Sequence, residues 1–167
     1  MNTSNVILIG MSGAGKSTLG VLLAKALGKH FVDTDILIQQ STGKLLQEII
    51  DGEGTARFLE IEEEILSSQA LTNTVIATGG SAVYSDKAMK ALKQNGIAVY
   101  LQVEFDALAK RLSNITTRGI VFKGSADLQA VYAERLPLYE QYADITVPST
   151  DRDVESTLAE IIDKIKE

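Results

Sequence analysis

The chain has 167 residues, 45% of them hydrophobic and 23% charged, which is the composition of one ordinary globular domain. Its net charge of −6 argues against a nucleic-acid partner, because phosphate backbones attract basic surfaces. It contains no cysteine, which excludes disulfides and thiolate metal sites, and it has no run of 18 apolar residues that would predict a membrane span. We therefore expect a single domain over residues 1–167 that is monomeric, cytoplasmic and without a membrane partner.

Short apolar runs alternate with apolar stripes at helical spacing along the whole chain. The runs predict strands at 6–9, around 31–32, and at 75–78, 97–103 and 143–147. The stripes predict helices at 19–27, 36–40, 45–50, 55–71, 85–94, 105–112, 127–142 and from Val154 onward, with Pro137 kinking or dividing the seventh. This alternation predicts a three-layer α/β/α fold with a five-stranded parallel sheet, whose ligands bind beyond the carboxyl ends of the strands.

The most informative stretch is Gly10–Ser17, which fits the pattern G-x-x-x-x-G-K-[ST]. It follows a predicted strand and opens a predicted helix, which is the context that a phosphate-binding loop requires. Its glycines let backbone N–H groups converge on phosphate oxygens, and the helix N-terminus adds partial positive charge. Lys16 can reach the β- and γ-phosphates, and the Ser17 hydroxyl can ligate Mg²⁺. The predicted nucleotide-binding residues of this loop are Gly13, Ala14, Gly15, Lys16, Ser17 and Thr18.

Two acids, Asp33 and Asp35, follow the second predicted strand. Side chains two residues apart at a strand end point the same way, so both can face one cleft. Phosphoryl transfer uses a carboxylate near Mg²⁺ and another that orients or deprotonates the attacking hydroxyl. The alternative is a solvated acidic turn that caps the following helix. Because a phosphate loop stands beside them, we favour the functional interpretation.

Further candidates for substrate binding lie later in the chain. Arg57 and Glu60 are three residues apart and share a helical face, so Glu60 can orient the guanidinium toward an anionic substrate, or the two can form a plain surface ion pair. Arg135 is a similar candidate, with an exposed surface arginine as the alternative. Gly79 and Gly80 follow the third strand and allow a ligand to approach the backbone closely, unless they form only a strand-end turn.

The segment from about 113 to 125 lacks periodicity and predicts a mobile lid. Its Arg118 can close over the transferred phosphate, as arginine fingers do; the alternative is an ordinary loop arginine. The acidic run Glu62–Glu64 is expected to be a solvated helix face. His30 is expected to lie on the surface.

Taken together, these motifs resemble the shikimate kinase family over nearly the whole chain. The matching motifs are the phosphate loop Gly10–Ser17, Asp33-x-Asp35, Gly52-Glu53 with Arg57 and Glu60 for G-E-x-x-F-R-x-x-E, Gly79-Gly80 for a glycine triplet, Arg118 for the lid arginine, and Arg135-x-Pro-x-Tyr139 with Ala143-Asp144.

The resemblance implies transfer of the γ-phosphoryl group of ATP to the 3-hydroxyl of shikimate, a small-molecule substrate of aromatic amino acid biosynthesis. It implies the fold of the nucleoside monophosphate kinases, with a substrate-binding helical segment at about 34–62 and the mobile lid. Asp35 would orient and could deprotonate the hydroxyl, Asp33 would hold Mg²⁺ through water, and Lys16 and Arg118 would stabilise charge on the phosphates. Implied substrate-binding residues are Asp35, Arg57, Glu60, Gly79, Gly80 and Arg135. Arg111 and Arg152 match positions near the adenine.

Some residues depart from the family pattern. Ser81 stands third in the glycine triplet, Ala56 replaces the phenylalanine before Arg57, Ile50 stands where another phenylalanine is usual, and the lid continues with Gly119-Ile120 instead of Pro-Leu. A wider pocket follows from the loss of two rings. Two alternatives therefore stay open: a kinase for another metabolite such as gluconate, and a nucleotide-dependent switch or binding module.

Overall fold

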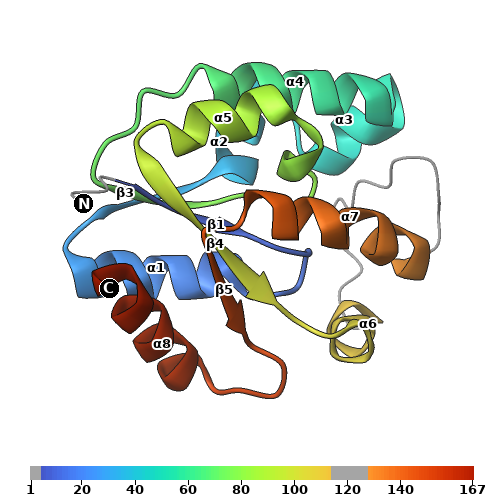
Figure 1. Cartoon of the computed structure of the whole chain (residues 1–167). Coiled ribbons are helices and arrows are strands. Elements are labelled where there is room, and N and C mark those ends of the chain that lie inside the picture. The colour runs from blue at the N-terminus through green and yellow to red at the C-terminus, as the bar shows by residue number, and fades with distance from the viewer. Residues whose placement is uncertain (1–4, 114–127) are drawn as a thin grey trace.

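The computed structural model describes residues 5–113 and 128–167, which form a parallel sheet between two layers of helices (Figure 1). The sheet has five strands in the order β2-β3-β1-β4-β5, and all neighbouring strands are parallel. The strands are β1 (Asn5–Ile9), β2 (His30–Asp33), β3 (Thr74–Ala77), β4 (Gly96–Gln102) and β5 (Ile145–Pro148). The predicted fold class is confirmed.

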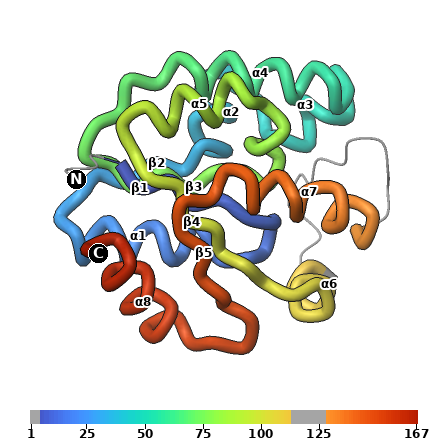
Figure 2. The backbone as a smooth tube through the Cα atoms, in the orientation of Figure 1, coloured from blue at the N-terminus to red at the C-terminus, as the bar shows by residue number. Residues whose placement is uncertain are grey.

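The helices cover both faces of the sheet (Figure 2). They are α1 (Lys16–Leu27), α2 (Thr34–Thr42), α3 (Leu46–Glu53), α4 (Thr55–Ser67), α5 (Asp86–Lys93), α6 (Phe105–Ser113), α7 (Leu128–Tyr142) and α8 (Val154–Lys166), with a short 3₁₀ helix η1 (Ala82–Tyr84). Helices α1 and α8 pack together below the sheet in Figure 1, and α4 and α5 pack together above it. No helix among residues 5–113 and 128–167 combines the length and apolar character needed to cross a bilayer.

The structure differs from the sequence prediction at the end of α4 and at Pro137. Helix α4 ends at Ser67 and not at Leu71, because the side chains of Ser68 and Gln69 donate hydrogen bonds to the Ile65 carbonyl and so satisfy a group at the helix end. Pro137 lies inside one continuous helix, so it does not divide α7.

The three central strands are buried on both faces, as their uninterrupted apolar runs predict. The register of β1, β2 and β3 brings the ends of these three strands level with one another. Ala77 of β3 pairs with Leu8 of β1 on one side and with Asp33 of β2 on the other. The segments that follow β1, β2 and β3 therefore leave the sheet at one edge, where the sequence predicts a ligand site.

A second, smaller apolar cluster lies among α2, α3 and α4. Its buried members are Ile38, Leu46, Ile49, Phe58 and Ile61. These helices thus pack against one another. The cluster fixes the position of α2, which carries Asp35.

At the amino end of β1, the buried side chain of Asn5 joins two segments. Its Nδ2 donates to the Leu71 carbonyl at 2.7 Å, and its Oδ1 accepts the Thr74 N–H at 3.0 Å.

We expect Asn5→Ala to lower the free energy of unfolding by about 1–3 kcal/mol, because the buried Thr74 N–H loses its acceptor. Urea denaturation measures this loss. The exposed Asn95→Ala is the control, with an expected change below about 0.5 kcal/mol; equal stability of the two variants would contradict the prediction.

Candidate active site

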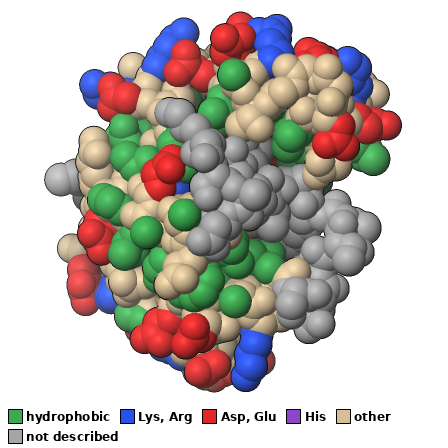
Figure 3. Space-filling model, turned by 90° about the vertical axis from the view of Figure 1, so that its right-hand side faces the viewer, with side chains coloured by type: hydrophobic (Ala, Val, Ile, Leu, Met, Phe, Trp, Pro, Cys, Tyr) green, Lys and Arg blue, Asp and Glu red, His purple; other side chains and the backbone are tan. Residues whose placement is uncertain are grey.

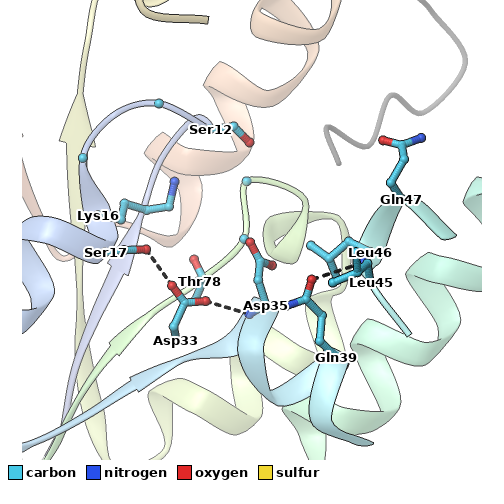
Figure 4. Close-up of a pocket in the computed structure, with 14 residues that line it drawn as sticks. Ser12, Lys16, Ser17, Asp33, Asp35, Gln39, Leu45, Leu46, Gln47 and Thr78 are labelled. Carbon is cyan, nitrogen blue, oxygen red and sulfur yellow. Dashed lines mark hydrogen bonds between the residues drawn. The ribbon is translucent and has the colours of Figure 1, made fainter. Parts of the chain in front are cut away.

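A cavity of about 310 Å³ opens at the edge of the sheet where β1, β2 and β3 end (Figure 4). Its lining comes from the phosphate loop, from the two acids after β2, from the turn after β3 and from α2 and α3. The lining residues are Ser12, Gly13, Gly15, Lys16, Ser17, Asp33, Asp35, Gln39, Leu45, Leu46, Gln47, Thr78, Gly79 and Gly80. Segments that are far apart in the sequence therefore meet here, as predicted.

The phosphate loop connects β1 to α1 and has the backbone that its glycines allow. Gly13 and Gly15 have φ angles of 85° and 94°, in the region that favours glycine. The N-terminal turn of α1 contains no acidic residue, so its N–H groups and partial positive charge remain suited to an anion. The buried Lys16 ammonium donates to the carbonyl oxygens of Gly10 at 2.6 Å and Met11 at 2.7 Å, which holds it over the loop.

Asp33 connects the phosphate loop to helix α2. Its Oδ2 accepts a hydrogen bond from the Ser17 hydroxyl at 2.6 Å. Its Oδ1 accepts the N–H groups of Asp35 at 2.9 Å and Ile36 at 3.4 Å, so Asp33 is also the N-cap of α2. The capping role that the sequence left as an alternative thus exists together with the contact to Ser17. Asp35 follows in the first turn of α2, half-buried, and its carboxylate points into the cavity.

Gly79 and Gly80 are required for space and not for backbone conformation. A Cβ on Gly79 would lie 2.6 Å from Asp35 Oδ1, and a Cβ on Gly80 would lie 2.8 Å from Arg135 Nη1. Side chains at these positions would displace one or both charged groups. The Gly79 N–H also donates to Thr34 Oγ1 at 3.1 Å, which ties this turn to α2.

Arg135 is fully buried behind Gly80, so it is not the exposed arginine that the sequence left as an alternative. Its Nε donates to the Tyr84 hydroxyl at 3.2 Å, and its guanidinium lies 5.2 Å from the centre of that ring. One turn further along α7, the Tyr139 hydroxyl donates to the Gly80 carbonyl at 2.6 Å. Burial raises the pKa of Tyr139, so this hydroxyl keeps its proton and remains a donor. Helix α7 therefore fixes both the guanidinium and the turn in front of it.

Glu62 is a buried acid next to the site that the sequence analysis missed. It was expected on a solvated helix face, and for Glu62 that expectation is wrong, because only 2% of the residue is exposed. The Ser81 hydroxyl donates to its Oε1 at 2.8 Å, and its Oε2 lies 3.2 Å from the Cβ position of Gly79. The signal was present in the sequence: Glu62 is four residues after Phe58 and four before Leu66, within the buried stripe of α4.

Burial raises the pKa of Glu62 to about 8. The hydrogen bond from Ser81 opposes this shift, the negative charge of Asp35 adds to it, and the positive charge of Arg135 opposes it. Within the described part of the chain, Oε2 has no hydrogen-bond partner. Burial therefore favours the neutral form of this carboxyl group near pH 7.

The structure does not bring Arg57 and Glu60 to the cavity. They form an ion pair at 3.0 Å on the exposed side of α4, next to a separate surface depression. Acidic and basic side chains are mixed along this upper margin of the molecule (Figure 3). The F-R-x-x-E pattern places its ring four residues before its acid, a spacing that Phe58 and Glu62 also have, and both of these are buried. If Phe58 and Glu62 are taken as the phenylalanine and the glutamate of the pattern, Leu59 occupies the position of its arginine.

The remaining predicted arginines lie in different places. The Arg111 guanidinium of α6 donates to the Gly13 carbonyl at 3.1 Å, so it lies against the phosphate loop. Arg152 precedes α8, where it forms an ion pair with Glu160 and donates to the Pro148 carbonyl at 2.9 Å. Arg118 lies outside the described residues, as does the predicted lid after Ser113.

The end of the cavity next to α2 and α3 contains residues that no sequence motif indicated. Gln39 of α2 and the segment Leu45–Gln47 line it, and the Gln39 side chain accepts the Leu46 N–H at 3.3 Å. Uncharged residues without a motif give no functional signal. Only the packing of α2 against α3 reveals their position.

A phosphate loop and two strand-end carboxylates around one cavity of a parallel sheet define a P-loop kinase. The family model for shikimate kinase matches residues 12–166, and the chain belongs to the shikimate kinase family. It is 40% identical over 164 residues to the shikimate kinase of Microcystis aeruginosa (96% of this chain, 84% of that one), and 35% identical over 163 residues to that of Bacillus anthracis (98% and 99%). The shikimate kinase of Acinetobacter baumannii, solved in complex with shikimate, has a TM-score of 0.87 at 30% identity, covering 98% of this chain and 93% of that one.

The buried carboxyl group predicts how stability depends on pH. The folded protein keeps a proton on Glu62 up to about pH 8, whereas the unfolded chain releases it near the ordinary value of 4.5. Stability is therefore lost as the pH rises from about 4.5 to 8. Glu62→Gln keeps the size and removes the ionisation. We expect the melting temperature of this variant, relative to wild type, to rise by about 3 °C or more between pH 5 and pH 8.5.

The control for this measurement is Glu64→Gln, an exposed glutamate on the same helix. Its melting temperature relative to wild type should not change with pH in the same way. Identical pH dependence of Glu62→Gln and wild type would show that Glu62 does not hold the proton.

Proposed function

We propose that this protein transfers the γ-phosphoryl group of ATP to the 3-hydroxyl of shikimate, with Mg²⁺ as the metal ion. The observation that carries the proposal is the sheet register, which gathers the phosphate loop, the two acids and the Gly79-Gly80 turn around one cavity. Kinases of the family to which the chain belongs use ATP. The Acinetobacter baumannii relative was solved with shikimate bound, which supports the choice of acceptor.

The phosphates of ATP would bind at the N-terminus of α1. Backbone N–H groups of residues 13–18 surround this point, and Lys16 would exchange its two carbonyl partners for phosphate oxygens. Arg111 lies beside the same loop and would contact the nucleotide. Arg152 near the adenine and Arg118 over the transferred phosphate remain predictions.

Ser17 and Asp33 fit a magnesium site. Mg²⁺ prefers oxygen ligands, usually keeps several waters and uses one or two carboxylates together with substrate phosphates. Ser17 would ligate the ion and Asp33 would hold it through water; their side chains are 2.6 Å apart. Within the described ranges no group of three or more histidine, cysteine, aspartate or glutamate side chains is placed to hold a metal ion. When bound, Mg²⁺ would neutralise charge on the phosphates.

At the acceptor end, Asp35 would orient the attacking hydroxyl and accept its proton. Its Oδ1 lies against Gly79, so a hydroxyl above that glycine would meet both the carboxylate and the backbone. Arg135 and the Gly80 backbone would bind the carboxylate of the acceptor. Arg57 would have to leave its ion pair with Glu60 to contribute, so the proposed carboxylate site depends on Arg135.

The two alternative functions are a kinase for gluconate or a related hydroxy acid and a nucleotide-dependent switch. Neither is favoured, because the relatives that match the chain over most of its length are shikimate kinases. The three functions differ in a simple respect, which is whether nucleotide turnover depends on an added acceptor and on which one.

ADP release from Mg·ATP, measured in a coupled assay, tests the function. We expect shikimate to raise the rate at least about 100-fold over the rate without acceptor, because Asp35 would position the shikimate hydroxyl for attack on the γ-phosphate and accept its proton. Gluconate should leave the rate near its basal value, and EDTA should abolish the stimulation. A stronger response to gluconate than to shikimate would identify gluconate as the substrate. Turnover that does not respond to any acceptor would support a nucleotide-dependent switch.

The role of Asp35 is tested by Asp35→Asn, which keeps the shape of the side chain and removes its basicity. We expect kcat to fall by about 10²–10⁴-fold, with little change in the KM for ATP, because the nucleotide end is untouched. The matched control is Asp163→Asn on the exposed side of α8, which should behave like wild type. Near-wild-type turnover of Asp35→Asn would eliminate an essential role for this carboxylate.

A further inference from the structure

Two nearly fully buried charged residues lie directly behind the glycines that face the cavity. Glu62 is 2% exposed and lies behind Gly79, and Arg135 is 0% exposed and lies behind Gly80. The proposed mechanism uses Arg135 to bind an anion. It gives no role to Glu62, although burying an ionisable side chain costs folding free energy.

The contacts of Glu62 are those of a neutral carboxyl group. A buried carboxylate needs several donors, whereas Glu62 receives one hydrogen bond, from the Ser81 hydroxyl, and its Oε2 has no partner among the described residues. A second acid lies against the same side of Gly79. Asp35 Oδ1 and Glu62 Oε2 both lie within 3.2 Å of one point, the Cβ position of Gly79. Two carboxyl groups so placed do not both ionise easily.

The charged groups around Glu62 come from two other helices. Asp35 faces it from α2, and Arg135 faces it from α7. The Arg135 Nε donates to Tyr84 and its Nη1 lies against Gly80, whereas the hydrogen bond of Glu62 comes from Ser81 and its Oε2 has no partner among the described residues. Glu62 therefore does not serve as the hydrogen-bonded counterion of this arginine.

Ser81 gives the arrangement a feature that the family pattern lacks. A glycine in this third position of the triplet would offer no hydroxyl to Glu62. The hydrogen bond from Ser81 to Glu62 joins the turn after β3 to α4, directly beside the two glycines of the site. Ser81 and Glu62 thus act together on the position of that turn.

We propose that Glu62 is a positioning residue that works as a protonated, neutral carboxyl group, holding the Gly79–Ser81 turn through Ser81 without cancelling the positive charge of Arg135. Loss of its proton adds a negative charge beside both Arg135 and Asp35. The anionic acceptor then binds more weakly, while the chemistry of the bound complex changes less. This inference rests on the proposed function, because it takes the acceptor to be a carboxylate such as shikimate.

Steady-state kinetics from pH 6.5 to 9.5 test the inference. For wild type we expect the KM for shikimate to rise about tenfold between pH 7 and pH 9.5, since a nearby buried charge opposes the binding of an anion, with kcat changing less than about threefold. Burial places the pKa of Glu62 at about 8, so the rise should be centred there. In Glu62→Gln the KM should no longer rise. A KM that is flat in wild type, or that rises equally in Glu62→Gln, would overturn the proposal.

Two further variants sharpen the test. The Ser81 hydroxyl lowers the pKa of Glu62, so Ser81→Ala should move the rise in KM to higher pH. Glu64→Gln, the exposed neighbour on α4, should keep the wild-type profile. A rise that stays at the same pH in Ser81→Ala would contradict the link between the two residues, and this arm remains decisive if Glu62→Gln fails to fold.

Infrared spectroscopy separates this inference from the proposed function. A protonated carboxylic acid has its own C=O stretching band, which should be present in wild type at pH 7 and disappear as the pH passes about 8. No shikimate-stimulated turnover at pH 7 would remove the proposed function and leave this band unaffected. Absence of the band at pH 7 would refute the protonated Glu62 whatever the substrate.

Discussion

The parallel register of β1, β2 and β3 is the constraint on which the site depends. Ala77 is level with Leu8 and with Asp33, so the three segments that follow these strands begin at the same height. Each segment contributes one element of a phosphoryl-transfer site: an anion-binding loop, a pair of carboxylates and a turn with two glycines. A shift of one residue in either pairing would turn the strand-end side chains to the opposite face and separate these elements. The apolar runs that bury the strands therefore also set the geometry of the active site.

The acceptor side depends on a different kind of constraint, which is space. Gly79 and Gly80 have no side chains because a carboxylate and a guanidinium lie against them, at distances where a Cβ could not fit. Around these glycines, helices α2, α4 and α7 each contribute one ionisable side chain, which are Asp35, Glu62 and Arg135. A small apolar cluster holds α2, α3 and α4 together. The nucleotide end is thus built on the sheet, and the acceptor end is built on helices that pack over it.

The sequence was sufficient where function and local structure share one signal. The phosphate loop has its glycines, its lysine and its strand-to-helix context in consecutive residues, and Asp33 and Asp35 follow a strand directly. On α4 the two signals point to different residues. The motif spacing selects Arg57, which is exposed, whereas the buried face of the helix contains Phe58 and Glu62. Spacing alone fits either register, and only the packing of the helix shows which side faces the cavity. Gln39 and Leu46 gave no signal, since their place in the cavity follows from how α2 and α3 pack.

Asp33 divides its two oxygens between the two ends of the active site. One oxygen holds the Ser17 hydroxyl beside the phosphate loop, and the other holds the first N–H groups of the helix that carries Asp35. One side chain therefore links the hydroxyl beside the phosphate loop to the first turn of the helix that carries Asp35. A substitution of Asp33 therefore removes the N-cap of α2 together with the contact to Ser17, so its effect combines a local loss of helix stability with a change beside the phosphate loop.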